Sequence, residues 1–310
     1  MSISENNYKI SVLVATKNRN RHIVQFIENL SILPAEPKWE LIVVDNGSTD
    51  GTSDALKQIR TVFPLKIYNE PLPGKSRALN LAILKAKGDL LVFTDDDIIP
   101  EQPWLQTLYD AACNHPEVNI FGGCIKVDEQ LLPKWIRQSF NLAGILASEH
   151  YLGEKTIVYP FRRYPIGPNM AVRKSAIAHI KEPWPLWLGP GTDLPLADER
   201  SFLEHISPVE GTDRLYVAKS IVWHIPEEDQ LRFLHALKRC YQSGLTQGKL
   251  DRINKSKPQE SYKKTGSLVF ARLNTCRSIR ELLCILIRGT GVIVGRYTKN
   301  MSLLSSEEAT

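Results

Sequence analysis

Three consecutive aspartates, Asp95–Asp97, follow an apolar run in the segment GDLLVFTDDDIIP, residues 88–100. Adjacent carboxylates repel each other, and an unpaired cluster raises the pKa values of its members. A bound Mg²⁺ or Mn²⁺ removes this repulsion, because such hard cations are often held by one or two carboxylates together with substrate phosphates. Asp95 and Asp97 form a D-x-D pair whose side chains can point the same way on an extended turn. The other interpretation is a solvated turn whose aspartates, together with Glu101, suit the N-terminus of a following helix.

A further acid, Asp45, ends the apolar run ELIVVD and is followed by Asn, Gly and Ser. An ordinary strand-ending turn would explain Asp45 on its own. Two acidic strand ends in one sheet favour a ligand that both of them contact.

Strand-like and helix-like patterns alternate over the first 127 residues. Strands are expected within 9–18, 39–52, 65–70, 89–95 and 117–127, and helices within 21–33, 53–61, 74–88 and 101–115. Thr52 or Ser53 is expected to cap the second of these helices. This alternation predicts an α/β fold with an open, mainly parallel sheet flanked by helices, in which ligands bind beyond the carboxyl ends of the strands. The residues Thr16, Asp45 and Asp95–Asp97 all lie at such ends, so three loops should converge on one crevice.

From about residue 128 to 230 prolines, glycines and tryptophans multiply, which indicates an elaboration packed on the same sheet. Trp184 and Trp187 lie in KEPWPLWLGPGTDLP, residues 181–195. They either cover a ligand as part of a mobile lid or close the core.

Composition excludes several classes of protein. The 310 residues are 43% hydrophobic and 24% charged, and no apolar stretch approaches the roughly 20 residues that cross a bilayer. The polar N-terminus lacks the apolar core of a signal peptide, and the five scattered cysteines suit a reducing compartment, so a cytoplasmic location is expected. The net charge of +5 is concentrated in residues 265–300, which contain six Arg and Lys residues and a single acidic residue, Glu281. This distribution argues against a nucleic-acid partner for the main domain.

The C-terminal region is expected to differ from the rest. We predict a main domain at 1–248, a polar linker at 249–266 and a basic amphipathic helical extension at 267–310. A basic amphipathic segment can lie on an anionic membrane, here through residues 267–300. A helical hairpin packed on the main domain, or an oligomer contact, would explain the same pattern.

Several motifs together resemble the family 2 glycosyltransferases, which have the GT-A fold. They appear in the family's order over residues 9–226: VLVATKNR (12–19), LIVVDNGSTDGT (41–52), GKSRALNLAILKAKGDLLVFTDDD (74–97), GPNMAVRKSA (167–176), DERSFL (198–203) and LYVAKSIVWHIP (215–226). The resemblance implies a GT-A domain at 1–248 with metal-dependent, inverting and non-processive transfer. The sugar would pass from a nucleotide-diphosphate donor, by default a UDP-sugar, to a glycan or lipid-linked acceptor in polysaccharide or cell-envelope glycan synthesis.

The resemblance also implies roles for individual residues on the donor side. Asp45 would contact the nucleotide base, and Arg77 would lie near the base and diphosphate. The segment with Asn169 and Met170 would line the donor-sugar pocket. The full set expected to bind the donor is Thr16, Asp45, Arg77, Asp95, Asp96 and Asn169. The ligands of Mg²⁺ or Mn²⁺ would be Asp97, Asp95 and His224, although a lone histidine after an apolar run is more often structural.

The motif DERSFL departs from the family pattern, because the order of its two acids is swapped. The resemblance places Glu199 on the catalytic aspartate and Asp198 on the glutamate before it. An inverting transferase needs one carboxylate to accept the proton of the acceptor hydroxyl, and either residue could do so. Cations must stabilise the leaving diphosphate.

Four other classes of protein would each leave a different feature in the sequence. A non-catalytic carbohydrate-binding or scaffold protein of the same fold would have a degraded metal site, and the swapped acids are the one feature that favours it. A sugar nucleotidyltransferase needs a glycine-rich activating loop, and a phosphatase with an aspartyl nucleophile needs its D-x-D after the first strand. A processive synthase has transmembrane helices and a Q-x-x-R-W motif. The sequence has no such activating loop, no D-x-D after the first expected strand, no apolar stretch long enough for a transmembrane helix and no Q-x-x-R-W motif.

Overall fold

The computed structural model describes residues 8–139, 142–160, 163–207, 214–253 and 276–298. The chain forms two compact units: unit 1 comprises Met1–Leu132 and Ala147–Glu227, and unit 2 comprises Pro133–Leu146 and Glu228–Thr310. The domain end expected at 248 instead falls within a helix, α9 (Phe233–Ile253). The expected linker therefore begins inside α9, and its remainder from 254 lies outside the described residues. Pro133–Leu146, expected on the main domain, belongs to unit 2 because its residues contact that unit more extensively.

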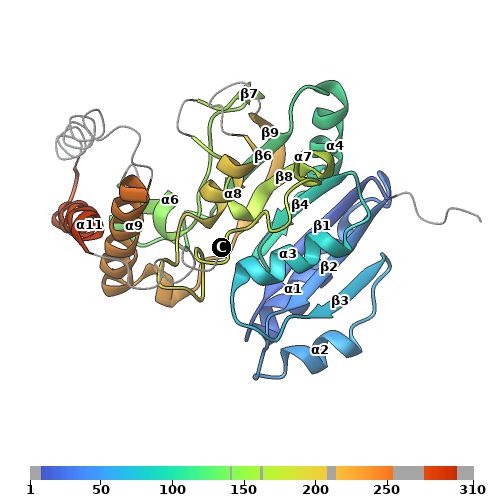
Figure 1. Cartoon of the computed structure of the whole chain (residues 1–310), viewed down its shortest axis with the longest axis horizontal. Helices are drawn as coiled ribbons and strands as arrows, with labels where there is room; N and C mark the ends of the chain where they lie inside the picture. Colours follow the sequence, from blue (N-terminus) through green and yellow to red (C-terminus); the bar gives the residue numbers. More distant parts are fainter. Residues whose placement is uncertain (1–7, 140–141, 161–162, 208–213, 254–275, 299–310) are drawn as a thin grey trace, which may run out of the picture. The chain divides into compact units, whose positions relative to one another are not determined.

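Unit 1 is built on one mixed sheet (Figure 1). Its described strands are β1 (Ile10–Thr16), β2 (Trp39–Asp45), β3 (Leu65–Asn69), β4 (Leu90–Thr94), β5 (Ile98–Pro100), β6 (Ile120–Lys126), β7 (Ile157–Val158), β8 (Met170–Arg173) and β9 (Arg214–His224). Their order is β3-β2-β1-β4-β8-β6-β9-β5, and β7 pairs with β9. The first four strands in this order are parallel, as predicted. Among the others, β6 and β9 are parallel, whereas β8, β5 and β7 are antiparallel to their partners.

Helices cover both faces of this sheet. The described helices of unit 1 are α1 (Asn20–Asn29), α2 (Thr52–Gln58), α3 (Lys75–Lys85), α4 (Trp104–Asn114), α7 (Lys174–Ile177) and α8 (Asp198–Ile206), with 3₁₀ turns at Leu30–Ile32 and Gly167–Asn169. Alternate residues of β1 enter different cores: Val12 joins Phe26 of α1, and Leu13 joins Leu79 of α3. Burial on both faces explains the continuous apolar run of this strand. The predicted α/β fold is therefore confirmed.

One local prediction was wrong. Gly51, with a φ of +90°, precedes α2, and the helix has no side-chain cap. Thr52 is already its first residue. The hydroxyl of Ser53 instead donates a hydrogen bond to Asp45 Oδ2.

Strand register brings the polar strand ends of unit 1 together. Thr16 at the end of β1 stands opposite Asp45 at the end of β2. The aspartates follow β4, the other neighbour of β1. On the far side, β5 is antiparallel to β9, so Ile98 stands opposite His224. Segments up to about 200 residues apart in the sequence therefore meet beside the aspartates.

The described residues of unit 2 fold mainly into helices. Those described are α5 (Lys134–Arg137), α6 (Leu142–Leu146), a 3₁₀ turn at Glu228–Leu231, α9 and α11 (Ile279–Tyr297). The long helices α9 and α11 pack side by side (Figure 1) through the glycines Gly244, Gly248, Gly291 and Gly295. A Cβ on Gly244 would lie 2.0 Å from the carbonyl oxygen of Arg288, so the two backbones touch. The expected helical extension is confirmed for α11. Within the described residues, every helix is too short or too polar to cross a bilayer.

Candidate active site

Each of the three aspartates is paired with a cation of the protein, and Asp96 and Asp97 share the same one, Arg19. Asp95 Oδ1 accepts a hydrogen bond from Lys75 Nζ at 2.6 Å. Asp96 is ion-paired through Oδ1 with Arg19 Nε at 2.8 Å, and its Oδ2 accepts from Thr16 Oγ1 at 2.5 Å. Asp97 Oδ2 accepts from Arg19 Nη2 at 2.8 Å. Protein cations and a hydroxyl therefore offset the repulsion among the carboxylates.

The alternative of a solvated turn before a helix is wrong. Asp96 is only 6% exposed, and the residues after Asp97 form the strand β5. Glu101 does not begin a helix, since α4 starts at Trp104. Its Oε1 accepts a hydrogen bond from Trp223 Nε1 at 3.0 Å.

Burial and charge act in opposite directions on this cluster. Burial raises the pKa of Asp96 to about 6, although the neighbouring Arg19 acts to lower it. For Asp97 burial also acts to raise the pKa, but His224, Arg19 and Lys75 outweigh it and the pKa is lowered. Asp97 is therefore ionised at neutral pH. Burial acts to lower the pKa of Lys75, but Asp95 foremost, and then the acids of α8, raise it, so Lys75 stays charged.

His224 and Asp97 form the pair best suited to a divalent cation. His224 Nε2 lies 3.4 Å from Asp97 Oδ1, and this oxygen is buried without a hydrogen bond from any of the described residues. The two ligands of an octahedral cation at 2.0–2.1 Å lie about 3 Å apart, so this pair fits one. Among the described residues no group of three or more His, Cys, Asp or Glu side chains could hold a metal. Asp95, the third expected ligand, is paired with Lys75 instead, so phosphate oxygens and water would have to complete the coordination.

The acid pair begins helix α8. Asp198 is 3% exposed, and Glu199 is half-buried. A Cβ on Gly167 would lie 2.9 Å from Glu199 Oε1 and 3.8 Å from Asp95 Oδ2, so these two carboxylates converge over this glycine. Asp198 turns the other way, because a Cβ on Gly189 would lie 2.7 Å from its Oδ2. Burial first, and then the charge of Glu199, raise the pKa of Asp198 well above its usual range. Glu199 is thus the acid that faces the aspartates.

The loop before α8 is fixed to the start of α3. Ser76 Oγ donates to the carbonyl of Leu188 at 3.1 Å, and the Asn80 amide bonds both the N–H and the carbonyl of Trp184. Trp184 is 1% exposed and stacks on Phe202 with ring centroids 4.3 Å apart. Of the two expected interpretations, core closure is therefore correct for Trp184. Trp187 is 36% exposed and stays a candidate for sugar stacking.

Asp45 uses its carboxylate within its own loop. Oδ1 accepts from the backbone N–H of Ser48 at 3.0 Å, and Oδ2 accepts from Ser53. Asp45 is 2% exposed. Arg77 is half-buried on α3, and among the described residues its guanidinium has no hydrogen bond or ion pair. Arg77 therefore has a cation to offer a ligand, whereas Asp45 shapes the turn.

Asn169 does not face a cleft, contrary to the expectation that it lines a sugar pocket. It is fully buried, and its Nδ2 donates to the carbonyls of Cys124 at 3.0 Å and Ser220 at 2.9 Å. Its Oδ1 accepts from Trp104 Nε1 at 2.9 Å. The amide therefore joins β6 to β9, and Met170, also fully buried, lies in the core.

Two residues of the site were missed in the sequence, Arg19 and Lys75. Lys75 is the first residue of α3, where the helix dipole disfavours a cation, so an acidic partner could have been inferred. Arg19 lies three residues beyond Thr16 in the same strand-end loop. It also pairs with Glu227, which ties the aspartates to the segment after His224.

Comparisons with known proteins identify the family. The model of the family described as glycosyl transferase family 2 matches residues 11–180. Glycosyltransferase AglE of Haloferax volcanii is 34% identical over 100 residues, which are 31% of this chain and 33% of AglE. The poly(ribitol-phosphate) beta-N-acetylglucosaminyltransferase TarS of Staphylococcus aureus is 34% identical over 110 residues, 34% of this chain and 18% of TarS. The chain thus matches a third or less of the length of these relatives.

Solved structures share the fold. The mannosyltransferase PcManGT of Pyrobaculum calidifontis, solved with GDP-Man and Mn²⁺, superposes with a TM-score of 0.57 at 19% identity, covering 98% of this chain and 81% of that one. Residues 1–349 of TarS in complex with UDP give a TM-score of 0.51 at 15% identity, covering 94% of this chain and 93% of that one. The GT-A fold expected from the motifs is confirmed.

Proposed function

The chain belongs to glycosyl transferase family 2, and from this premise we propose that it transfers a sugar from a nucleotide-diphosphate donor to a hydroxyl group of an acceptor. The observation that carries the proposal is the convergence of Glu199 and Asp95 over Gly167. One of these acids lies in the segment expected to bind the donor, and the other in the segment expected to supply the base. Their meeting point suits a reaction between donor and acceptor.

The donor is a nucleotide sugar. PcManGT was solved with GDP-Man, and TarS with UDP and UDP-GlcNAc, so this fold accommodates more than one base. UDP is our default. The expected donor set of Thr16, Asp45, Arg77, Asp95 and Asp96 is kept in the proposal, and Asn169 is assigned to the framework around it. Within this donor set, Arg77 carries a positive charge that has no ion pair with any described residue.

A divalent cation, Mg²⁺ or Mn²⁺, belongs to the proposed site. Asp97 and His224 would hold it, since Asp97 Oδ1, which is buried and accepts no hydrogen bond within the described part of the chain, lies next to an imidazole nitrogen. When bound, such a cation supplies positive charge to the diphosphate as negative charge develops there. Asp95 is proposed to act on the donor through its second oxygen, because Lys75 occupies Oδ1.

Glu199 is proposed as the general base. It is half-buried on the side of Asp95, whereas Asp198 is buried against Gly189 with a raised pKa. A carboxylic acid that keeps its proton at neutral pH cannot accept another. Asp198, the residue before Glu199 at the start of α8, is instead proposed to help position Glu199.

The proposed step is a single displacement. The acceptor oxygen forms a bond to the anomeric carbon as the bond from that carbon to the diphosphate oxygen breaks. Glu199 takes the proton of the acceptor hydroxyl, and the nucleoside diphosphate leaves with the electron pair. Attack from the face opposite the leaving group inverts the anomeric configuration. Lys75 keeps a positive charge between Asp95 and the acid pair throughout.

The acceptor is proposed to be a glycan or a lipid-linked glycan in polysaccharide or cell-envelope synthesis. TarS is named for transfer to poly(ribitol-phosphate), and we propose a polymeric acceptor of this kind. We place the reaction in the cytoplasm or at the inner face of the plasma membrane, with residues 267–300 in contact with anionic lipid.

Calorimetric titration with UDP, GDP and dTDP, each in Mn²⁺ and in EDTA, tests the proposal. We expect one nucleotide to bind tightly in Mn²⁺ and weakly or not at all in EDTA. Transfer from the matching nucleotide sugar should then be sought with water and simple glycans as acceptors. If no nucleotide binds in Mn²⁺, the proposal fails, and a non-catalytic role for the same fold takes its place.

A further inference from the structure

We propose that unit 2 docks on an anionic lipid surface through an exposed apolar stripe on α11, formed by Ile279, Leu283, Leu286, Ile293 and Tyr297. The stripe gives the membrane contact of the proposed function a specific surface and rests on that part of the proposal. It does not depend on sugar transfer. Vesicle binding and transfer can therefore fail separately.

The stripe covers one side of the helix. Its residues are spaced by four, three, seven and four positions, which keeps them on one face over about 27 Å at 1.5 Å per residue. Ile279 is 77% exposed, Ile293 60% and Tyr297 73%. Thr290 fills the seven-residue gap on the same face and is also exposed. The outer side of a surface helix usually carries charged residues, so an apolar outer side indicates a binding surface.

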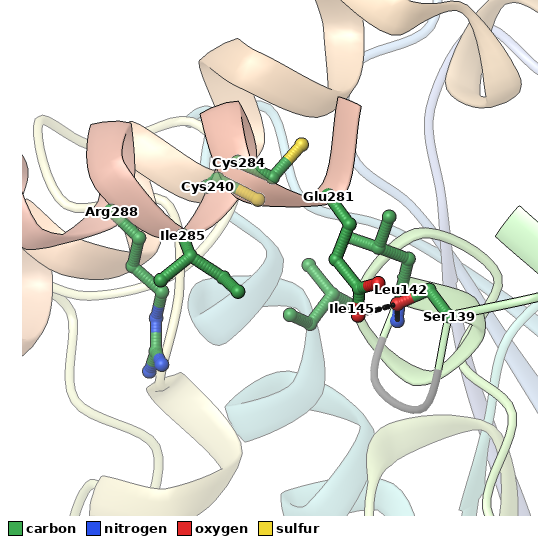
Figure 2. A pocket seen from close by; sticks show the side chains of 8 residues that line it. All are labelled: Ser139, Leu142, Ile145, Cys240, Glu281, Cys284, Ile285 and Arg288. Carbon is green, nitrogen blue, oxygen red and sulfur yellow. Dashed lines mark hydrogen bonds between the residues drawn. The ribbon is translucent and has the colours of Figure 1, made fainter. Parts of the chain in front are cut away.

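The opposite side of α11 already has partners within unit 2. Figure 2 shows Glu281, Cys284, Ile285 and Arg288 lining a pocket with Cys240 of α9. Ser139, Leu142 and Ile145 complete the lining, and Ser139 Oγ donates to Glu281 Oε1 at 2.5 Å. The backbone at Gly291 and Gly295 touches α9. These contacts fix the rotation of α11 about its axis and keep the stripe outward.

Charge selects the occupant of this surface. Unit 2 contains seventeen Lys and Arg against seven Asp and Glu, a net charge of +10, which leaves −5 for unit 1. Exposed cations of unit 2 include Arg232, Lys238, Arg252, Arg277 and Arg280. An anionic membrane attracts such a unit, and apolar side chains then insert at the boundary between headgroups and acyl chains. A second copy would bring another charge of +10 against the first, so self-association is disfavoured.

Co-sedimentation of the full chain with vesicles tests the inference. We expect binding to phosphatidylcholine vesicles that contain phosphatidylglycerol, weak binding to phosphatidylcholine alone, and loss of binding as NaCl is raised. The double variant Leu283→Ser with Leu286→Ser should lower the partition coefficient by about tenfold or more. The control is Val62→Ser with Leu84→Ser, which removes two exposed apolar side chains of unit 1, 88% and 76% exposed, and should bind like the parent.

Circular dichroism first establishes that both variants keep the helix content of the parent. Binding that is absent, or equal for both kinds of vesicle, overturns the proposal. Unchanged binding of the Leu283 and Leu286 variant overturns the assignment to the stripe. A dimer in analytical ultracentrifugation that the same variant abolishes, without vesicle binding, assigns the stripe to a second copy instead. Vesicle binding without any transfer activity supports the proposal that the stripe binds lipid. It counts only against the proposed sugar transfer.

Discussion

His224 Nε2 lies 3.4 Å from Asp97 Oδ1, an approach fixed by the antiparallel pairing of β9 with β5. The two residues are 127 positions apart in the sequence, and among the described residues Asp97 Oδ1 has no hydrogen bond that a ligand would have to displace. The guanidinium of Arg19 holds the other oxygen of Asp97 at 2.8 Å. The carboxylate of Asp97 thus binds the guanidinium of Arg19 through one oxygen, and its other oxygen faces the imidazole of His224.

This arrangement predicts that Asp97→Asn weakens Mn²⁺-dependent nucleotide binding. A neutral amide is a poorer ligand than a carboxylate, and even partners outside the coordination sphere typically change metal affinity by about 10–100-fold. We expect at least a loss of that order in calorimetry with Mn²⁺ and little change in EDTA. The control is Asp54→Asn, an exposed acid on α2 whose side chain is 75% exposed. Equal affinity of the D97N and parent proteins in Mn²⁺ would remove Asp97 from the metal site.

The assignment of the base predicts unequal effects within the acid pair. Glu199→Gln should lower kcat by roughly 10²–10⁴-fold, the usual contribution of general-base catalysis, without changing nucleotide affinity. Asp198→Asn should cost much less, because burial and the charge of Glu199 raise the pKa of Asp198 and so favour its neutral form, which an amide resembles. Glu204→Gln, further along α8, is the matched control. A larger loss of kcat in D198N than in E199Q would reverse the assignment.

The buried His150 predicts a dependence of stability on pH. Burial, and after it the charge of Arg163, lowers the pKa of His150 to about 4. An unfolded chain, with a histidine pKa near 6.5, takes up a proton below that value that the folded chain does not accept. Stability from this residue is therefore complete above about pH 6.5 and is lost as the pH falls toward 4, by up to about 3 kcal/mol.

Urea unfolding at about pH 7 and about pH 5 measures this effect. His150→Gln should make the free energy of unfolding less dependent on pH over that range, while the exposed His205→Gln should leave the dependence unchanged. A pH dependence that is the same in H150Q and the parent would show that folding does not lower the pKa of His150.

The contact between α9 and α11 predicts opposite results for two glycines. Gly244→Ala places a methyl group 2.0 Å from the carbonyl oxygen of Arg288, so the helices must separate, at a cost of about 1–3 kcal/mol. Gly289→Ala meets nothing within 4 Å and should gain about 0.5–1 kcal/mol from helix propensity. Thermal unfolding of the two variants should therefore shift Tm in opposite directions. A lower Tm for both would show that the spacing of these helices is not the controlling factor.

The parts of the fold that follow from local pattern were predictable. Continuous apolar runs in the sequence predict β1, β2 and β4. The polar residues that end these runs predict the edge of the sheet at which the site lies. The acids at these ends, Asp45 and Asp97, were recognised because a carboxylate after an apolar run stands out. The pairing of β6, β8 and β9 was not predicted, since antiparallel insertion into a parallel sheet depends on contacts remote in sequence.

The partners of the aspartates were missed for a related reason. Arg19 and Asp97 are separated by 78 residues, and a surface arginine looks the same in the sequence as one that holds two buried acids. Asn169 was misplaced because its motif lies beside the site while its amide points into the sheet. Pro133–Leu146 was assigned to the wrong unit because short helices carry little sequence signal of the surface on which they pack.

The tryptophans allow the region of the proposed site to be followed by intrinsic fluorescence. Trp184 is shielded from water, whereas Trp187, in the loop before the acid pair, and Trp223, next to His224, are each 36% exposed. Indole emission shifts to longer wavelength when the ring meets water, so the red edge of the fluorescence spectrum is enriched in these two rings. The indole N–H of Trp223 also bonds Glu101, one strand away from Asp97. The chain therefore carries its own optical reporters in the loop that precedes the proposed base and on the strand that carries a proposed metal ligand.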